Sequence, residues 1–228
     1  MRSDLRYNII ATGSQGNALI LNDAVMIDCG VPFKCLKPYY KALKLVLLTH
    51  IHADHFCKAT IRRLARERPS LRFGCGPWLV DALVSCGVNK ANVDVLRDGV
   101  MYGYGICNVI PIELVHNVPN CGYKLHFRQG KVFYATDTNN LNGITARRYD
   151  LYFVEANYTE AEIQDKIQQK KALGVYAYER QVVKNHLSKE KCDDFIYRNA
   201  APDSVYVYMH CHRDREERHD DNCEDHQL

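Results

Sequence analysis

The sequence has no long apolar run and no pair of cysteines spaced for a zinc or redox motif. No uncharged apolar segment approaches the roughly eighteen residues of a membrane-spanning helix, and residues 1–10 lack the apolar region of a signal peptide. The ten cysteines are irregularly spaced and include no Cys-x-x-Cys, which argues against a disulfide framework. We therefore expect a cytoplasmic protein with no membrane partner, whose cysteines are mostly reduced and buried.

The chain also lacks internal repeats and low-complexity linkers, so nothing marks a boundary between two large domains. With 228 residues, 46% apolar and 25% charged, it has the composition of an ordinary globular domain. Residues 213–228 hold seven acidic residues against three arginines, whereas residues 1–212 hold 27 basic and 20 acidic residues. We predict one domain over residues 1–212, whose basic charge can favour anionic substrates, and an acidic, disordered tail over residues 213–228.

Short apolar segments separated by Gly, Asn, Asp and Pro predict a mixed α/β structure. Strands are expected at 5–11, 17–22, 24–27, 44–49, 71–74, 106–115, 122–127, 131–135, 150–155 and 204–210. Helices are expected near 34–42, 54–67, 77–86, 159–172 and 187–199. The first strands follow one another without helices and later strands alternate with them. This order favours a β core layered with helices over a purely parallel, doubly wound sheet.

One segment carries a dense set of metal-binding side chains. The apolar residues 45–48 lead directly into Thr49-His50-Ile51-His52-Ala53-Asp54-His55, which places three imidazoles and a carboxylate within six residues. His50 and His52 point to one side of an extended chain. Asp54 and His55 lie where a helix would begin and can face a neighbouring position. Imidazole and carboxylate are common ligands of Zn²⁺ and related metals. The segment therefore predicts two adjacent metal sites rather than a solvated polar loop.

This segment resembles the H-x-H-x-D-H signature of the metallo-β-lactamase superfamily, and the resemblance implies that a histidine, an aspartate and a final histidine, each after a later strand, complete the site. The sequence offers a candidate for each of the three. Alternating apolar residues lead to His116 and to His210, and Asp137 follows the apolar residues 132–135. Taken alone, His116 is an ordinary strand histidine. Only the complete set gives it a functional interpretation.

The H-x-H-x-D-H pattern of residues 50–55 resembles the signature of the metallo-β-lactamase superfamily. Gly13-Ser14-Gln15-Gly16-Asn17, Ile27-Asp28-Cys29-Gly30 and the stretch 150–158 are similar to motifs of its small single-domain YycJ-like branch. That branch is related to phosphodiesterases and to tRNA-maturing nucleases, and the resemblance covers most of residues 8–212. It implies an αββα sandwich, in which helices flank two mixed β-sheets.

The same resemblance implies a ligand set and a metal. One divalent ion would be held by His50, His52 and His116. A second would be held by Asp54, His55 and His210, and Asp137 would bridge the two. Zn²⁺ is the expected metal, with Mn²⁺ and Fe²⁺ as alternatives, and no organic cofactor is expected. Asp28 would support the metal loops without being a ligand, and Asp54 would also orient the nucleophile.

Two further histidines compete for roles at this site. His186 and His210 could each supply the last ligand, and we assign that role to His210. His186 precedes a predicted helix with Ser188 as its N-cap. It resembles a histidine that contacts the substrate phosphate or protonates the leaving oxygen in related phosphodiesterases, which implies a catalytic role. The segment 210–212 departs from the family pattern, so His212 stays an alternative to His210 as ligand.

The resemblance implies a hydrolase that uses a hydroxide held between two metals and acts on phosphodiester bonds, as a phosphodiesterase or nuclease. Hydrolysis of a lactone or thioester is one alternative, because the same hydroxide attacks a carbonyl carbon. A non-catalytic, metal-stabilised module that binds nucleic acid is another.

The expected partner is a phosphodiester substrate, with nucleic acid as one candidate. A basic helix follows the metal motif and carries Lys58, Arg62, Arg63, Arg66 and Arg68, with Arg72 beyond it. These side chains could contact phosphates, although a solvated helix face is the favoured interpretation. No nucleic-acid recognition motif is present, and the sequence does not predict an oligomeric state.

Overall fold

Short apolar strands form two six-stranded sheets within residues 4–211, the range that the computed structural model describes. The first sheet follows chain order and contains β1 (Tyr7–Ala11), β2 (Ala18–Leu21), β3 (Val25–Ile27), β4 (Leu45–Leu48), β5 (Arg72–Cys75) and β6 (Val93–Val95). Its first three strands are antiparallel, and β3 to β6 are parallel. β2, β3 and β4 are buried along their whole length, as expected for strands covered on both faces.

The second sheet mirrors this arrangement with strands from the other half of the chain. It contains β7 (Tyr102–Gly103), β8 (Asn108–Leu114), β9 (Asn120–Phe127), β10 (Gly130–Ala135), β11 (Leu151–Glu155) and β12 (Val205–Met209), in the reverse order from β12 to β7. Strands β7 to β10 are antiparallel, and β10, β11 and β12 are parallel. Each sheet is therefore mixed.

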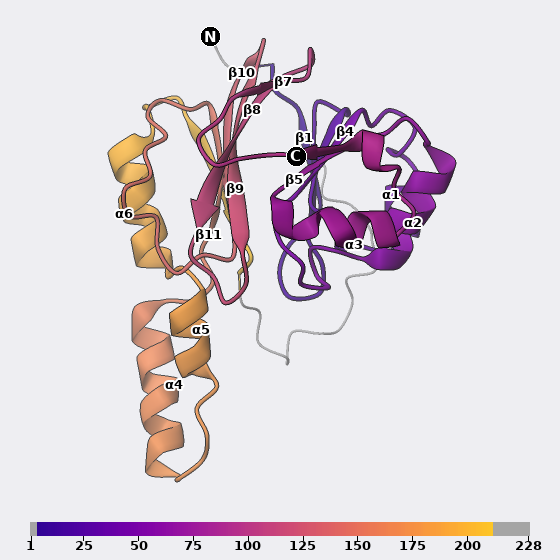
Figure 1. Cartoon of the computed structure of the whole chain (residues 1–228). Helices are drawn as coiled ribbons and strands as arrows, with labels where there is room; N and C mark the ends of the chain where they lie inside the picture. Colours follow the sequence, from indigo (N-terminus) through magenta and orange to yellow (C-terminus); the bar gives the residue numbers. More distant parts are fainter. Residues whose placement is uncertain (1–3, 212–228) are drawn as a thin grey trace.

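Helices cover the outer faces of both sheets (Figure 1). The first sheet is covered by α1 (Phe33–Leu36), α2 (Lys58–Glu67) and α3 (Val80–Ser85), with short 3-10 turns at Pro77–Leu79 and Lys90–Asn92. The second sheet is covered by α6 (Lys189–Asn199). A pair of helices, α4 (Glu160–Ala172) and α5 (Glu179–Asn185), projects beyond the sheets. The predicted αββα sandwich is confirmed.

Three apolar layers stabilise the sandwich, one between the two sheets and one on the outer face of each sheet. The layer between the sheets contains side chains of both, among them Leu47 and Phe153. Outside the second sheet, Phe133 stacks on Phe195 of α6 with ring centroids 5.0 Å apart. A buried tyrosine also joins the sheets by a polar contact, because the Tyr123 hydroxyl donates to the carbonyl of Leu48 at 2.6 Å. The end of β4 is thereby fixed directly before the histidine-rich segment.

Several predicted elements differ from the structure at their ends. The helix expected over 34–42 ends at Leu36, because Pro38 follows and has no N–H with which to continue it. The helix expected from residue 54 begins at Lys58, because the amides of His55 and Phe56 both donate to the carbonyl of His52 in a tight turn. The strands β6 and β7 and the helix α5 were not predicted, since they are too short to show a periodic pattern.

The predicted N-cap of α6 is confirmed, whereas the predictions for the end of the chain fall outside the described range. Ser188 caps α6, since its Oγ accepts a hydrogen bond from the amide of Lys191 at 3.2 Å. Within residues 4–211 the structure contains no helix with the length and apolar composition needed to cross a membrane. His212 and the predicted acidic tail over 213–228 lie outside the described residues.

Gly30 generates a prediction about how the fold holds the site. A Cβ at Gly30 would overlap the carbonyl group of Asp54, so Gly30→Ala must displace that loop. We expect this variant to lose about 1–3 kcal/mol of unfolding free energy and to bind Zn²⁺ more weakly. Urea unfolding and zinc competition with a chromogenic chelator measure the two effects.

Gly103→Ala is the matched control, because a Cβ there meets only Asn108 Oδ1, at 3.4 Å. Equal stability and equal zinc affinity in Gly30→Ala and Gly103→Ala would show that the close approach of Gly30 to Asp54 is unimportant.

Candidate metal centre

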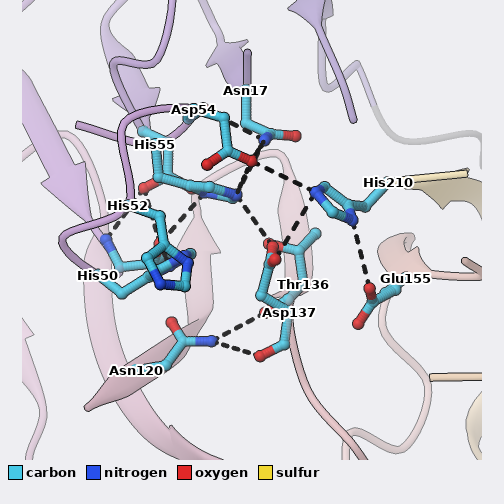
Figure 2. Close-up of polar contacts among 12 residues, drawn as sticks. Asn17, His50, His52, Asp54, His55, Asn120, Thr136, Asp137, Glu155 and His210 are labelled. Carbon is cyan, nitrogen blue, oxygen red and sulfur yellow. Dashed lines mark hydrogen bonds and ion pairs between the residues drawn. The ribbon is translucent and has the colours of Figure 1, made fainter. Parts of the chain in front are cut away.

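The residues predicted as ligands gather at one edge of the sandwich, where strands from both sheets end (Figure 2). His50 lies two residues beyond the end of β4, His116 two residues beyond β8 and Asp137 two residues beyond β10. His210 directly follows β12. The turn between β4 and α2 supplies the remaining three, His52, Asp54 and His55. Segments far apart in the sequence therefore converge because their strands end at the same edge.

Three imidazoles form the first set. His50 Nε2 lies 3.1 Å from His52 Nδ1, and His116 Nε2 lies 3.3 Å from the same atom. Two nitrogens bound to one tetrahedral Zn²⁺ at 2.0–2.1 Å are roughly 3.3 Å apart, so the spacing fits a shared cation. His50, His52 and His116 can therefore hold one metal ion.

The protonation state of these rings also suits a metal ligand. Burial, reinforced by the neighbouring His55, lowers the pKa of His50 to about 2. Burial likewise lowers the pKa of His116. His116 Nδ1 lies 3.0 Å from the carbonyl oxygen of Asn185, which can only accept, so Nδ1 carries the hydrogen. The lone pair of His116 is then on Nε2, the atom that faces the other two rings.

The second set combines two imidazoles with one carboxylate. Asp54 Oδ2 lies 3.6 Å from His55 Nε2 and 3.5 Å from His210 Nε2, and these three residues can hold a second ion. Asp137 lies between the two sets. Its carboxylate oxygens are 2.9 Å from His55 Nε2, 3.6 Å from His210 Nε2 and 3.9 Å from His116 Nε2. The position of Asp137 is therefore that of a bridging ligand.

Charge is concentrated around this second set. Although burial opposes it, the charges of Asp137 and Asp28 raise the pKa of His55 well above its ordinary value. Burial also lowers the pKa of His210, but Asp137, Asp54 and Glu155 have the larger combined effect and raise it to about 10. In return, His55 and His210 hold the pKa of Asp137 well below its ordinary range despite its burial. Buried groups of opposite charge thus face one another across the centre.

Two buried atoms show that the cluster suits a cation. Among the described residues, Asp137 Oδ2 and His210 Nε2 are buried without a hydrogen bond, although Asp137 Oδ2 lies 2.9 Å from His55 Nε2. Both atoms belong to predicted ligands and both face the middle of the cluster (Figure 2). A set of imidazole nitrogens and carboxylate oxygens is one that Zn²⁺ and related divalent ions prefer. The residues present therefore fit divalent metal ions.

Asp28 lies behind the ligands and supports them. Its fully buried carboxylate lies 2.7 Å from His55 Nδ1 and accepts hydrogen bonds from Thr49, at 3.0 Å from the amide and 2.9 Å from the hydroxyl. Tyr134 donates to the same carboxylate from the second sheet, at 3.1 Å. The carboxylate leaves His55 Nε2 to face the metal cluster.

The backbone is strained at three residues of this region. Asp28, Asp137 and His210 have φ values of 60°, 56° and 52°, in the left-handed region that residues with a Cβ rarely adopt. The chain turns sharply after each strand at these positions. Such strain persists only where surrounding contacts enforce it, as at functional sites.

His186 borders the cluster, but it is held by a residue to which the sequence analysis gave no role. His186 Nδ1 lies 2.6 Å from Oε1 of Glu155, the buried last residue of β11. Glu155 Oε2 accepts from the amides of Thr138, at 2.8 Å, and Leu187, at 3.3 Å. The His186 ring also stacks on His210, with centroids 5.2 Å apart. His186 is therefore rigidly placed beside both predicted metal positions.

Three residues of the site were missed as functional residues. Glu155 ends an apolar strand, which is a signal that could have identified it. Asn17 closes the Gly13–Gly16 turn, and its Nδ2 lies 2.8 Å from His55 Nε2 and 3.4 Å from Asp54 Oδ2. The Asn120 amide donates to the backbone carbonyls of Thr136 and Asp137, at 3.0 and 2.7 Å. No sequence pattern distinguishes Asn120 from other strand residues.

The basic residues after the metal motif are largely engaged elsewhere. Arg68 donates to the carbonyls of Tyr40 and Leu43, and Arg63 pairs with Glu67 while lying over the ring of Phe33. Arg72 pairs with Asp94, between β5 and β6. These contacts support the favoured interpretation of a solvated and structural helix face.

Comparisons with known proteins identify the family and support the fold. A family model described as the β-lactamase superfamily domain matches residues 24–184. The metallo-β-lactamase fold protein YhfI from Bacillus subtilis is similar in structure, with a TM-score of 0.70 at 15% identity over 91% of this chain and 86% of that chain. Human tRNase Z, short form, has a TM-score of 0.66 at 14% identity over 92% and 94% of the two chains.

A diphosphatase from the PhnP family gives a TM-score of 0.63 at 14% identity over 91% of this chain and 87% of that one. At these identities the three structures show a shared fold. No curated protein matches the sequence. The family model spans more than half of the chain and includes the histidine-rich segment and Asp137. The chain therefore belongs to the metallo-β-lactamase superfamily.

Proposed function

We propose that this protein is a phosphodiesterase or small nuclease that depends on two divalent metal ions. The observation that carries the proposal is the His186–Glu155 pair, which places a fixed imidazole beside two adjacent sets of metal ligands. Such an imidazole can protonate a leaving alkoxide, a task that phosphodiester cleavage requires. The fold is also similar to those of a tRNase Z and a diphosphatase, which supports the choice of phosphorus chemistry.

In this proposal the predicted ligands form two metal sites that share one carboxylate. Zn²⁺, or Mn²⁺ or Fe²⁺ in its place, would be held by the three-histidine set and by the set of Asp54, His55 and His210, with Asp137 shared. Two such ions lower the pKa of a water molecule and stabilise charge on the phosphate oxygens. The protein's own task is to hold the ligands apart from bulk water and to move protons.

Asp54 is placed to orient the attacking water. Its side chain is 22% exposed, whereas that of Asp137 is 3% exposed, so Asp54 is the carboxylate that solvent reaches. Burial opposes ionisation of Asp54, but His210 and His55 together lower the pKa of its carboxyl group, which favours the ionised form that can accept a proton. Asp54 Oδ2 faces both His55 and His210, so the proton acceptor lies within the second set.

His186 is placed to serve the leaving group. Glu155 holds Nδ1 and fixes the orientation of the ring, which leaves Nε2 for the leaving oxygen. The ring is 17% exposed and can therefore meet a substrate. Glu155 is in turn fixed by two backbone amides, so it acts as a positioning residue for His186.

Metal-dependent turnover tests the proposal directly. We expect the purified protein reloaded with Zn²⁺ or Mn²⁺ to hydrolyse bis(p-nitrophenyl) phosphate, as followed by p-nitrophenolate absorbance. Asp137→Ala should abolish turnover, because it removes the carboxylate shared by both ligand sets. Absence of turnover with either metal would overturn phosphodiester chemistry and favour a lactone or thioester substrate, or a non-catalytic metal-stabilised module.

Replacing His186 tests the proton donor. We expect His186→Gln to lower kcat roughly 10²- to 10⁴-fold on a dinucleotide, whose alkoxide leaving group needs a proton, and far less on the p-nitrophenyl ester. Chromatography of the dinucleotide products and absorbance of p-nitrophenolate measure the two rates.

His126→Gln is the matched control, since His126 lies away from the site and binds the Tyr149 hydroxyl at 2.8 Å. Equal losses on both substrates in His186→Gln would argue against proton donation and for a role in metal binding. Lactone opening, if present, should survive the substitution.

A further inference from the structure

A large pocket opens beside the metal centre and has no role in the chemistry described above. It has a volume of about 720 Å³, within the range of small-molecule sites. Its walls come from the segments that follow β5 and β6 and from β8 with the loop that follows it. His116 and Asn120 both line it, so one side of the pocket is part of the metal centre. The pocket therefore adjoins the place where a substrate would meet the metals.

Trp78 supplies a rigid aromatic surface in this pocket. Its ring Nε1 donates to the carbonyl of Thr49 at 3.2 Å, directly before His50, and the ring packs against Gly76, where any Cβ would overlap it. The side chain nevertheless remains 37% exposed and lines the pocket. An aromatic ring that is held in place and partly open to solvent is suited to stacking on a planar ligand group.

Asn120, which also lines the pocket, carries a buried hydrogen-bond acceptor. Both contacts of its Nδ2, with the carbonyls of Thr136 and Asp137, fix the orientation of the amide. Its Oδ1 is buried and has no hydrogen-bond partner among the described residues. A buried acceptor without a partner is costly, and a ligand N–H or hydroxyl would satisfy it.

The charges of the pocket favour a neutral group over a second phosphate. Besides His116, its charged lining residues are Arg97, Asp98 and Glu113. Two carboxylates against one guanidinium disfavour an additional anion there. The phosphate of a substrate is therefore directed to the metal centre, and an uncharged planar group to the pocket.

We propose that this pocket binds the base of a nucleotide phosphodiester, stacked on Trp78, while the phosphate lies at the metal centre. The inference rests on the proposed phosphodiesterase function and specifies its substrate class. It assigns Trp78 as a specificity-determining residue that touches the base.

Direct binding can be measured because Trp78 is the single tryptophan of the chain. We expect adenosine 5′-monophosphate to quench the fluorescence of the metal-loaded protein saturably, and ribose 5-phosphate to leave it nearly unchanged at equal concentration. Excitation at the red edge of tryptophan absorption avoids absorption by adenine. Equal responses to the two ligands, or none to either, would overturn the base site.

Inhibition of bis(p-nitrophenyl) phosphate hydrolysis gives a second readout. We expect the advantage of adenosine 5′-monophosphate over ribose 5-phosphate, taken as the ratio of their inhibition constants, to shrink roughly 5- to 150-fold in Trp78→Leu. Trp78→Phe should keep most of the advantage. Tyr176→Leu, at an exposed aromatic residue between α4 and α5, is the matched control and should keep all of it.

The outcomes separate this inference from the function on which it rests. Turnover of the chromogenic diester with an unchanged inhibition ratio in Trp78→Leu would overturn the base site and leave the phosphodiesterase function intact. Saturable quenching by adenosine 5′-monophosphate without any diester turnover would support the base site and contradict the phosphodiesterase function.

Discussion

Burial of the Asp137 carboxylate among imidazoles is the constraint on which the rest of the site depends. A buried charge is costly unless neighbouring groups of opposite charge compensate it. His55 and His210 supply that compensation, and their own pKa values are raised in return. Divalent cations can take over this role from the protons of the two rings, because the same residues belong to the sets that could hold a metal ion. The cluster is therefore organised around positive charge before any substrate arrives.

The fold meets this constraint by ending strands of both sheets at one edge. Asp28, Asp137 and His210 occupy left-handed backbone conformations, and each is held by contacts from another segment. Asp28 bonds to the loop after β4 and to Tyr134, while the amide of His210 donates to the hydroxyl of Thr12. The apolar core supplies the stability, and these polar contacts position the ligands. The site is precise because strain at its turns is offset by contacts on all sides.

Much of this arrangement could be predicted from local patterns. The dense H-x-H-x-D-H pattern after an apolar strand identified His50. The family resemblance, together with the apolar strands that precede them, identified Asp137 and His210. The two sheets then bring these strand ends to one edge of the sandwich. The position of Glu155 at the end of an apolar strand marks it as a candidate, but its pairing with His186 could not be predicted, because the two residues are 31 positions apart and meet only in the folded chain. The pocket is also a property of the fold, since Trp78 lies in the turn after β5 of the first sheet and Asn120 begins β9 of the second. Short elements such as β7 and α5 span too few residues to show a periodic pattern.

We infer that one cluster of histidines and carboxylates can hold two divalent ions that share Asp137. Metal content by inductively coupled plasma mass spectrometry, after loading with Zn²⁺ and removal of the excess, tests it most directly. We expect two ions per chain in the wild-type protein and about one in His116→Ala, which leaves the second set complete. Asp137→Asn should lose ions as well. One ion or none in the wild-type protein, or a content that is unchanged in Asp137→Asn, would rule out two ions that share Asp137.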